Sequence, residues 1–196
     1  MLVLEELLSG AGGLIFDCDG TLINSATLYS MAWAVGFATS GKLMSRQWYN
    51  SRHGLSEHGL MDDFERDHQV TLQRNQVVSV MRRTYLDNMA SDLHELRAIS
   101  QIAKRFKGKI PIAVASGGSR EIVTKSLEAL DLKGLFDAVV TFDDVGVAKP
   151  QPDIFIEAAR RLSLKPGDCL VFEDSPQGIQ AARRAGMPVV DVAHIL

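Results

Sequence analysis

The chain has few cysteines and no long apolar run. Only Cys18 and Cys169 occur among its 196 residues, so there is no disulfide framework and we expect a protein of the reducing cytoplasm. No stretch of 18 consecutive apolar residues is present, and Glu5 and Glu6 stand where a signal peptide would carry basic residues. We therefore expect neither a membrane span nor a signal peptide.

The chain also lacks a large excess of charge of either sign. The 21 Lys and Arg residues against 24 Asp and Glu residues give a net charge of −3. Since no basic footprint extends over the chain, we do not expect nucleic acid as a partner. Hydrophobic content of 46% and charged content of 23% are ordinary for a soluble globular protein. The chain carries no internal repeat and no low-complexity linker, and we expect a monomer or a weak homodimer.

From residue 91 onward, strand-like and helix-like runs alternate with short connections. The expected strands cover residues 11–17, 110–115, 138–142, 169–172 and 189–190. The expected helices cover residues 93–106, capped by Asp92, and runs that begin near residues 120, 152 and 176. This alternation predicts an α/β fold in which a doubly wound parallel sheet, a Rossmann-like core, is covered by helices on both faces.

The interval between the first and second of these strands is too long for one crossover helix. Residues 24–90 lack strand alternation, and their apolar residues recur at helical spacing over 28–37 and 77–86. We therefore predict a small all-helical cap, inserted after the first strand and seated over the strand ends. In this interpretation residues 1–23 and 91–196 form the α/β catalytic core, and residues 24–90 form the cap.

Polar residues follow four of the expected strands, and we call these groups the four stations. The stations are Asp17 to Thr21, Ser116-Gly117-Gly118, Lys149 to Asp153, and Glu173-Asp174. Ligands of open α/β sheets bind at the carboxyl ends of the strands. Two carboxylates 4 Å apart repel each other by about 4 kcal/mol at an effective dielectric constant of 20. The stations therefore predict a site for a metal ion and an anionic substrate.

The order of the stations resembles the haloacid dehalogenase superfamily, in its phosphatase and phosphomutase members, across essentially the whole chain. The matching segments are residues 17–22, 114–118, 149–155 and 172–179. Within the superfamily the chain looks like the β-phosphoglucomutase-like branch with a helical cap. Its compact length and residues 178–192 most resemble small fructose-1-phosphate-type sugar phosphatases.

This resemblance implies a role for each station. Asp17 would be the nucleophile that forms an aspartyl-phosphate, and Asp19 would protonate the leaving alcohol and later deprotonate the attacking water. Thr21 and Ser116 would donate hydrogen bonds to the phosphoryl oxygens, helped by backbone amides near Gly117. Lys149 would be a fixed positive charge that pairs with Asp17 and the transferring group.

The resemblance also implies Mg²⁺ as the cofactor and a small phosphorylated metabolite, such as a sugar phosphate, as the substrate. Asp17, Asp174 and the backbone carbonyl of Asp19 would hold the ion, and Glu173 would be an alternative or more distant ligand. In the cap, Arg52 and His53 lie in a segment similar to the substrate-facing loop of relatives. Other cap residues depart from the usual pattern, with Asn24 to Ala26 and Tyr29 in place of acidic residues and a histidine.

Other functions remain open at this point. A β-phosphoglucomutase-type mutase would use the same core residues, but it requires an activating bisphosphate and yields an isomer. A catalytically silent member of the fold has little physical reason to keep every charged station. A dehalogenase needs no metal, and a signalling receiver domain is shorter and has no helical insert after its first strand. A Mg²⁺-dependent phosphatase is the function that the sequence favours.

Overall fold

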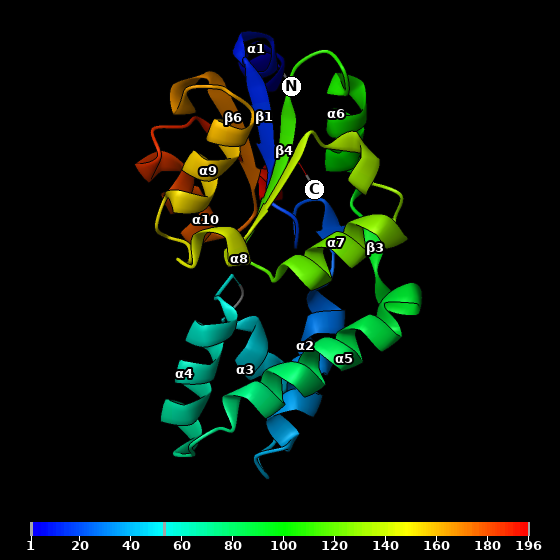
Figure 1. Ribbon diagram of the computed structural model, residues 1–196, viewed down its shortest axis with the longest axis vertical. Helices are drawn as coiled ribbons and strands as arrows, with labels where there is room; N and C mark the ends of the chain where they lie inside the picture. The colour runs from blue at the N-terminus through cyan, green and yellow to red at the C-terminus, as the bar shows by residue number, and fades with distance from the viewer. Residues whose placement is uncertain (1, 53, 196) are drawn as a thin grey trace.

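The computed structural model describes residues 2–52 and 54–195 and is drawn in Figure 1. Five parallel strands form one sheet in the order β5-β4-β1-β6-β7. The strands are β1 (Gly13–Phe16), β4 (Ile112–Ser116), β5 (Ala138–Thr141), β6 (Cys169–Glu173) and β7 (Val189–Asp191). The first strand of the chain is thus the central one. The predicted α/β fold is confirmed.

The three middle strands are apolar runs because helices cover both faces of the sheet. Every residue of β1, β4 and β6 is buried, as expected for parallel strands. Leu14 pairs with Ile112 on one side and Leu170 on the other. This register brings the carboxyl ends of β1, β4 and β6 to one edge of the sheet, where the four stations follow.

Helices on opposite faces of the sheet take alternate side chains of β1. Leu14 and Phe16 belong to the core cluster that includes Ile99 of α6 and Ile122 of α7, whereas Ile15 packs in the cluster of Phe155 on α9. The helices around the sheet are α1 (Leu2–Gly10), α6 (Arg97–Phe106), α7 (Arg120–Ala129), α8 (Phe142–Val145), α9 (Asp153–Arg161) and α10 (Pro176–Arg184). Three short 3₁₀ helices are η1 (Lys133–Leu135), η2 (Pro166–Asp168) and η3 (Val192–His194).

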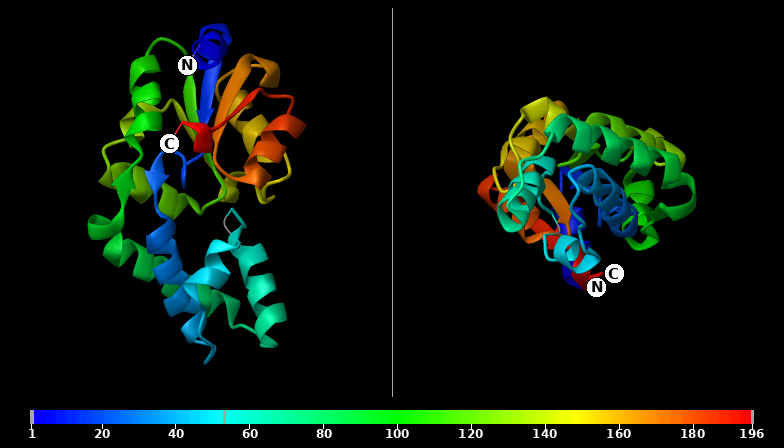
Figure 2. Two further views of the ribbon diagram at one scale, coloured as in Figure 1. Left: turned by 180° about the vertical axis from the view of Figure 1, so that it is seen from behind. Right: turned by 90° about the horizontal axis from the view of Figure 1, so that it is seen from below.

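Four helices form a separate layer beyond the carboxyl ends of the strands, as Figures 1 and 2 show. They are α2 (Ala26–Ala38), α3 (Arg46–Asn50), α4 (Glu57–His68) and α5 (Arg74–Asp92), and we call them the cap. Gly36 lets α2 approach α5 closely, because a Cβ atom at this position would lie 2.8 Å from the Val77 carbonyl oxygen. The helical insertion after the first strand is confirmed, and its division at residues 23/24 and 90/91 stays a prediction.

A two-stranded ribbon joins the cap to the core. β2 (Ile23–Asn24) pairs antiparallel with β3 (His94–Glu95). The prediction that Asp92 caps a helix over residues 93–106 is therefore wrong. Asp92 ends α5, Leu93 is extended at φ −96° and ψ 127°, and α6 begins only at Arg97. The apolar spacing that predicted one helix continues through an extended crossing segment.

None of the helices in residues 2–52 and 54–195 is both long enough and apolar enough to cross a membrane. Cys18 and Cys169 are both buried free thiols.

Aromatic rings pack together inside the cap, and Phe64 lies at their centre. The Phe64 ring stacks on Phe37 of α2 with centroids 3.8 Å apart, and Trp48 of α3 meets it edge-on at 5.4 Å. Because Phe64 is fully buried, we expect Phe64→Ala to lower the free energy of unfolding by about 3–5 kcal/mol. Urea denaturation measures this loss.

Ile156→Ala, at a site that is 44% exposed on α9, is the control and is expected to change stability by less than about 0.5 kcal/mol. A Phe64→Ala protein no less stable than this control would contradict the prediction.

Candidate active site

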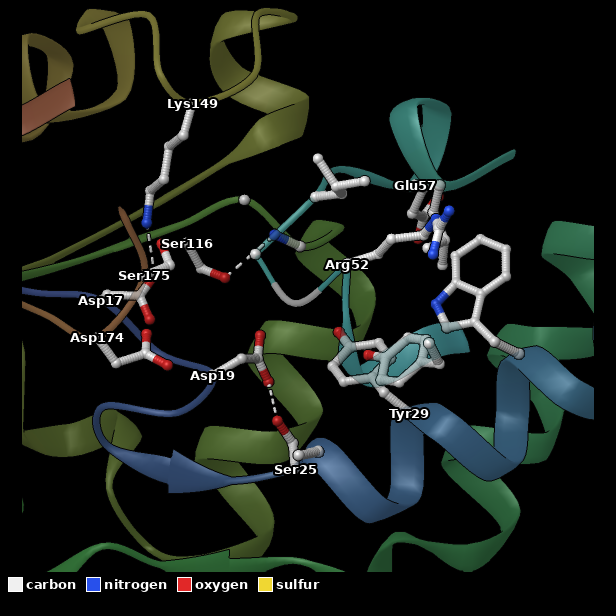
Figure 3. A pocket seen from close by; sticks show the side chains of 18 of the residues that line it. Asp17, Asp19, Ser25, Tyr29, Arg52, Glu57, Ser116, Lys149, Asp174 and Ser175 are labelled. Carbon is white, nitrogen blue, oxygen red and sulfur yellow. Dashed lines mark hydrogen bonds and ion pairs between the residues drawn. The ribbon is translucent and has the colours of Figure 1, made fainter. Parts of the chain in front are cut away.

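A buried ammonium group joins two strand ends at the centre of the site. Lys149, in the loop between α8 and α9, places Nζ 2.6 Å from Asp17 Oδ1 and 2.6 Å from Glu173 Oε2. Asp17 follows β1, and its backbone N–H donates to the Phe172 carbonyl in β6 at 2.9 Å. The side chains of Lys149, Asp17 and Glu173 are 7%, 7% and 1% exposed, so salt screens these ion pairs little. Figure 3 shows the Lys149 side chain reaching down to Asp17.

Burial and the neighbouring charges together shift the pKa values in this cluster. Burial raises the pKa of Asp17 well above its usual range, the Glu173 carboxylate raises it further, and Lys149 acts in the opposite direction. Burial by itself would lower the pKa of Lys149, but the charges of Asp17 and Glu173 outweigh that effect and raise it. Lys149 therefore keeps its proton, and Asp17 pays an electrostatic penalty for its negative charge.

Glu173 has hydrogen-bond partners on both oxygens. Oε2 accepts from Lys149, while Oε1 accepts from the Asp174 N–H at 3.1 Å, the Ser175 N–H at 3.0 Å and the Ser175 hydroxyl at 2.9 Å. Gly178 in the first turn of α10 makes room for this carboxylate, since a Cβ atom there would overlap it. Through these hydrogen bonds Glu173 positions the Lys149 ammonium group and stabilises the turn that leads into α10. Its direct contact with a metal ion stays a prediction.

The carboxylates fit a divalent cation. Asp17, Glu173 and Asp174 each offer an oxygen, and these oxygens lie within 4.8 Å of one another. Gly20, at φ +91°, leaves the space that Asp174 occupies, because a Cβ atom there would overlap the Asp174 carboxylate. One ammonium group faces these three acids, so a hard cation bound by oxygen atoms would relieve the remaining repulsion.

Asp19 lies where the core meets the cap. Its Oδ1 accepts a hydrogen bond from the Ser25 hydroxyl at 2.7 Å, and Ser25 is the N-cap residue of α2. Figure 3 shows the Asp19 side chain on the pocket side of this junction, between Asp174 and Tyr29. The sequence spacing thus places one acid of the Asp17/Asp19 pair against Lys149 and the other against the entrance to the cap.

The second station also reaches the pocket, but Thr21 does not. Ser116 and Gly117 both line the pocket, and the Ser116 hydroxyl accepts from the Gly118 N–H at 3.1 Å. Thr21 is fully buried in the turn after Asp19, and its hydroxyl has no hydrogen-bond partner among the described residues. Thr21 does not belong to the pocket lining that the structure describes, and its hydrogen bond to the phosphoryl group stays a prediction.

Core and cap together enclose the pocket. About 780 Å³ of space, part of it open to solvent, lies between the stations and the helices α2, α3 and α4. The core contributes Asp17, Ser116 and Lys149, and the cap contributes Tyr29 and Glu57. The arrangement can hold an anion at the sheet and an organic group under the cap.

The sequence model of the haloacid dehalogenase-like hydrolases matches residues 12–186 of the chain. The chain belongs to this family. Fructose-1-phosphate phosphatase YqaB of Escherichia coli K12 is 33% identical over 180 residues, which are 92% of this chain and 95% of that protein.

Two solved structures share the fold of this hydrolase. CbbY from Rhodobacter sphaeroides, in complex with phosphate, has a TM-score of 0.83 at 25% identity, over 91% of this chain and 84% of that one. A putative β-phosphoglucomutase from Thermotoga maritima has a TM-score of 0.69 at 26% identity, over 90% and 83%. The predicted β-phosphoglucomutase-like subfamily and phosphatase class of the hydrolase are thereby confirmed.

The two cap residues predicted to meet substrate have different outcomes. Arg52 lines the pocket, but Figure 3 shows its side chain running away from Asp17 and Asp19. Its Nε lies 3.1 Å from Asp63 Oδ2 and its Nη2 2.5 Å from Asp67 Oδ2. His53 lies outside the residues that the structure describes.

Sequence reasoning missed the side chains that the cap of the hydrolase contributes to the pocket. Tyr29, Trp33, Tyr49 and Glu57 all line it. One available signal was the spacing of Ser25, Tyr29 and Trp33, since residues four apart share a helix face. Tyr49 and Glu57 carry no such signal, because their placement depends on how α3 and α4 pack against α2.

Proposed function

We propose that this protein is a Mg²⁺-dependent phosphatase that hydrolyses small phosphorylated metabolites, sugar phosphates foremost, through an aspartyl-phosphate on Asp17. The observation that carries the proposal is the buried Lys149 ammonium between Asp17 and Glu173, at the strand ends and beneath the cap. The name of the E. coli relative, a fructose-1-phosphate phosphatase, supports the substrate class.

In the first half of the reaction, an oxygen of Asp17 attacks the phosphorus atom. The bond from phosphorus to the ester oxygen breaks, and Asp19 gives its proton to the departing alkoxide, so that the alcohol leaves neutral. Lys149 lies beside the attacking carboxylate and balances the charge of the phosphoryl group. Ser116 and the backbone at Gly117 face the same space and would hold the phosphoryl oxygens.

In the second half, water attacks the phosphorus atom of the aspartyl-phosphate. Asp19, now ionised, takes a proton from this water, and the bond from phosphorus to the Asp17 oxygen breaks. Inorganic phosphate leaves, and both acids return to their starting protonation states. The Ser25 hydroxyl holds Asp19 at 2.7 Å, which orients it for both proton transfers.

Asp17 and Asp174, with the backbone carbonyl of Asp19, would hold Mg²⁺. The ion would neutralise the repulsion between these carboxylates and the phosphoryl group and orient the latter for attack. We expect a chelator to abolish phosphate release from sugar phosphates and p-nitrophenyl phosphate, and excess Mg²⁺ to restore it. Turnover that persists in chelator would contradict the metal requirement, and an isomer formed without free phosphate would indicate a mutase.

Thermal unfolding gives a second measurement of metal binding. The pKa of Asp17 is raised in the folded protein, so the metal-free protein loses stability as pH rises above the unfolded value of about 3.9 and through the folded one. Mg²⁺ binds the ionised form and competes with protons. We therefore expect Mg²⁺ to raise the midpoint of unfolding more at pH 8 than at pH 5, and Asp174→Asn to reduce this gain. An equal gain at both pH values would argue against Asp17 as a ligand.

A further inference from the structure

Acidic side chains already neutralise the cationic groups that line the pocket. Within residues 2–52 and 54–195, the lining contains two basic side chains, Lys149 and Arg52. Lys149 is held by Asp17 and Glu173 in the core. Arg52 is held by Asp63 and Asp67 of α4 in the cap, as given above.

The Arg52 guanidinium is fixed in place as well as neutralised. Besides the two aspartates, Nη1 donates to the Trp48 carbonyl at 3.0 Å and to the Ser51 hydroxyl at 2.8 Å. Four of its five N–H groups are thus used within the cap. Its Cζ atom also lies 4.1 Å from the centroid of the Trp48 ring. Arg52 would have to break several of these contacts to reach a second anionic group on a substrate.

The cap end of the pocket also presents a carboxylate, whose charge is balanced by an arginine outside the described lining. Glu57, the first residue of α4, lines the pocket. Its Oε2 lies 2.8 Å from Arg82 Nη2 of α5, and Arg82 does not belong to the pocket lining that the structure describes. The remaining polar groups at this end include the phenols of Tyr29 and Tyr49. A carboxylate accepts hydrogen bonds from hydroxyl groups but offers none to a phosphate or carboxylate group, and neutral phenols bind hydroxyl groups as donors and as acceptors.

We infer that the substrate's leaving group is uncharged and bears hydroxyl groups, and that Asp63 and Asp67 set this preference by withholding the charge of Arg52 from the pocket. The inference rests on the proposed phosphatase function and narrows its substrates to monophosphates of neutral polyols and sugars. Sugar bisphosphates and phosphorylated carboxylic acids are then poor substrates. Asp63 and Asp67 act through Arg52 and are positioning residues for specificity.

Two pairs of substrates test the preference, because each pair differs in one charged group. They are fructose 1-phosphate against fructose 1,6-bisphosphate, and glycerol 3-phosphate against 3-phosphoglycerate. We expect kcat/KM to be at least about tenfold higher for the first member of each pair, with the difference mainly in KM. Initial rates of phosphate release in saturating Mg²⁺ give both constants.

Variants of α4 test the mechanism of the preference. Asp63→Asn/Asp67→Asn removes both charges beside Arg52 and is expected to lower KM for the bisphosphate by about tenfold, with kcat for fructose 1-phosphate unchanged. Asp63→Asn alone is a second variant, and its effect is expected to be smaller because Asp67 still pairs with Arg52. It leaves in place the hydrogen bond that Asp67 accepts from Trp48 Nε1 at 2.9 Å. Asp62→Asn is the matched control, since Asp62 pairs with Arg74 and is 61% exposed.

The outcomes separate this inference from the proposed function. If no monophosphate is hydrolysed, the proposed function fails. If bisphosphate and monophosphate are hydrolysed equally well, the phosphatase stands and the inference is overturned. It is also overturned if Asp62→Asn lowers KM for the bisphosphate as much as the variants at Asp63 do, because a general change in charge then explains the effect.

Discussion

Asp17→Asn is expected to lower kcat for phosphate release by a factor of at least about 10⁴, because an amide cannot form the aspartyl-phosphate. The substitution keeps the size of the side chain. It also removes one negative charge from the group formed with Glu173 and Asp174. Since the pKa of Asp17 is raised in the folded state, the metal-free variant is expected to be at least as stable as the wild type. Assays with p-nitrophenyl phosphate and fructose 1-phosphate measure the loss.

Asp153→Asn is the matched control for this experiment. Asp153 begins α9, four residues after Lys149, and it is exposed. The same change of acid to amide there is expected to leave kcat within about twofold of the wild type and stability within about 0.5 kcal/mol. Equal turnover by Asp17→Asn and the wild type would end the proposal of a covalent intermediate on Asp17.

Lys149→Met is expected to reduce both stability and activity. Breaking a buried ion pair by removal of one partner costs about 3–5 kcal/mol, because the other charge is left uncompensated. Here two carboxylates, Asp17 and Glu173, lose the same ammonium group. We expect kcat to fall by a factor of about 10³, since the group that balances the phosphoryl charge is lost. Urea denaturation and phosphate release measure the two effects.

The pH dependence of the Lys149→Met variant distinguishes charge from packing. Without the ammonium group Asp17, whose pKa is already raised, binds a proton still more readily in the folded state, so the variant regains stability as pH falls from 8 toward 5. Lys165→Met, at an exposed position before η2, is the control and should change stability by less than about 0.5 kcal/mol. A loss of stability that is the same at pH 5 and pH 8 would assign the defect to packing.

Local patterns were enough to predict the sheet and the stations. An apolar run of four or five residues followed at once by an acid or a serine is a local signal, and β1 before Asp17 and β4 up to Ser116 both show it. The parallel order of the strands then places these residues at one edge without any further information. The contact of Lys149 with Glu173, 24 residues later, depends on tertiary structure, and the motif alone did not indicate it.

The cap was harder to predict because its side chains are placed by packing between helices. Helical spacing indicated that residues 24–90 are helical, but not which faces meet the core. Arg52 was expected to face the substrate, and only the fold brings Asp63 and Asp67 beside it, 11 and 15 residues later in the chain. The sequence also could not show that Thr21 is buried outside the pocket lining, since one tight turn decides which side chain enters the pocket.

The pairing of β2 with β3 has a consequence for the evolution of this architecture. The chain leaves the sheet at Ile23–Asn24 and returns at His94–Glu95 on adjacent strands, whose paired Cα atoms are about 5 Å apart. A lobe of any length whose two ends can meet at that separation can be grafted at this position without disturbing the register of the five strands. The cap can thus be exchanged or resized as a module, while the residues at the edge of the sheet keep their arrangement.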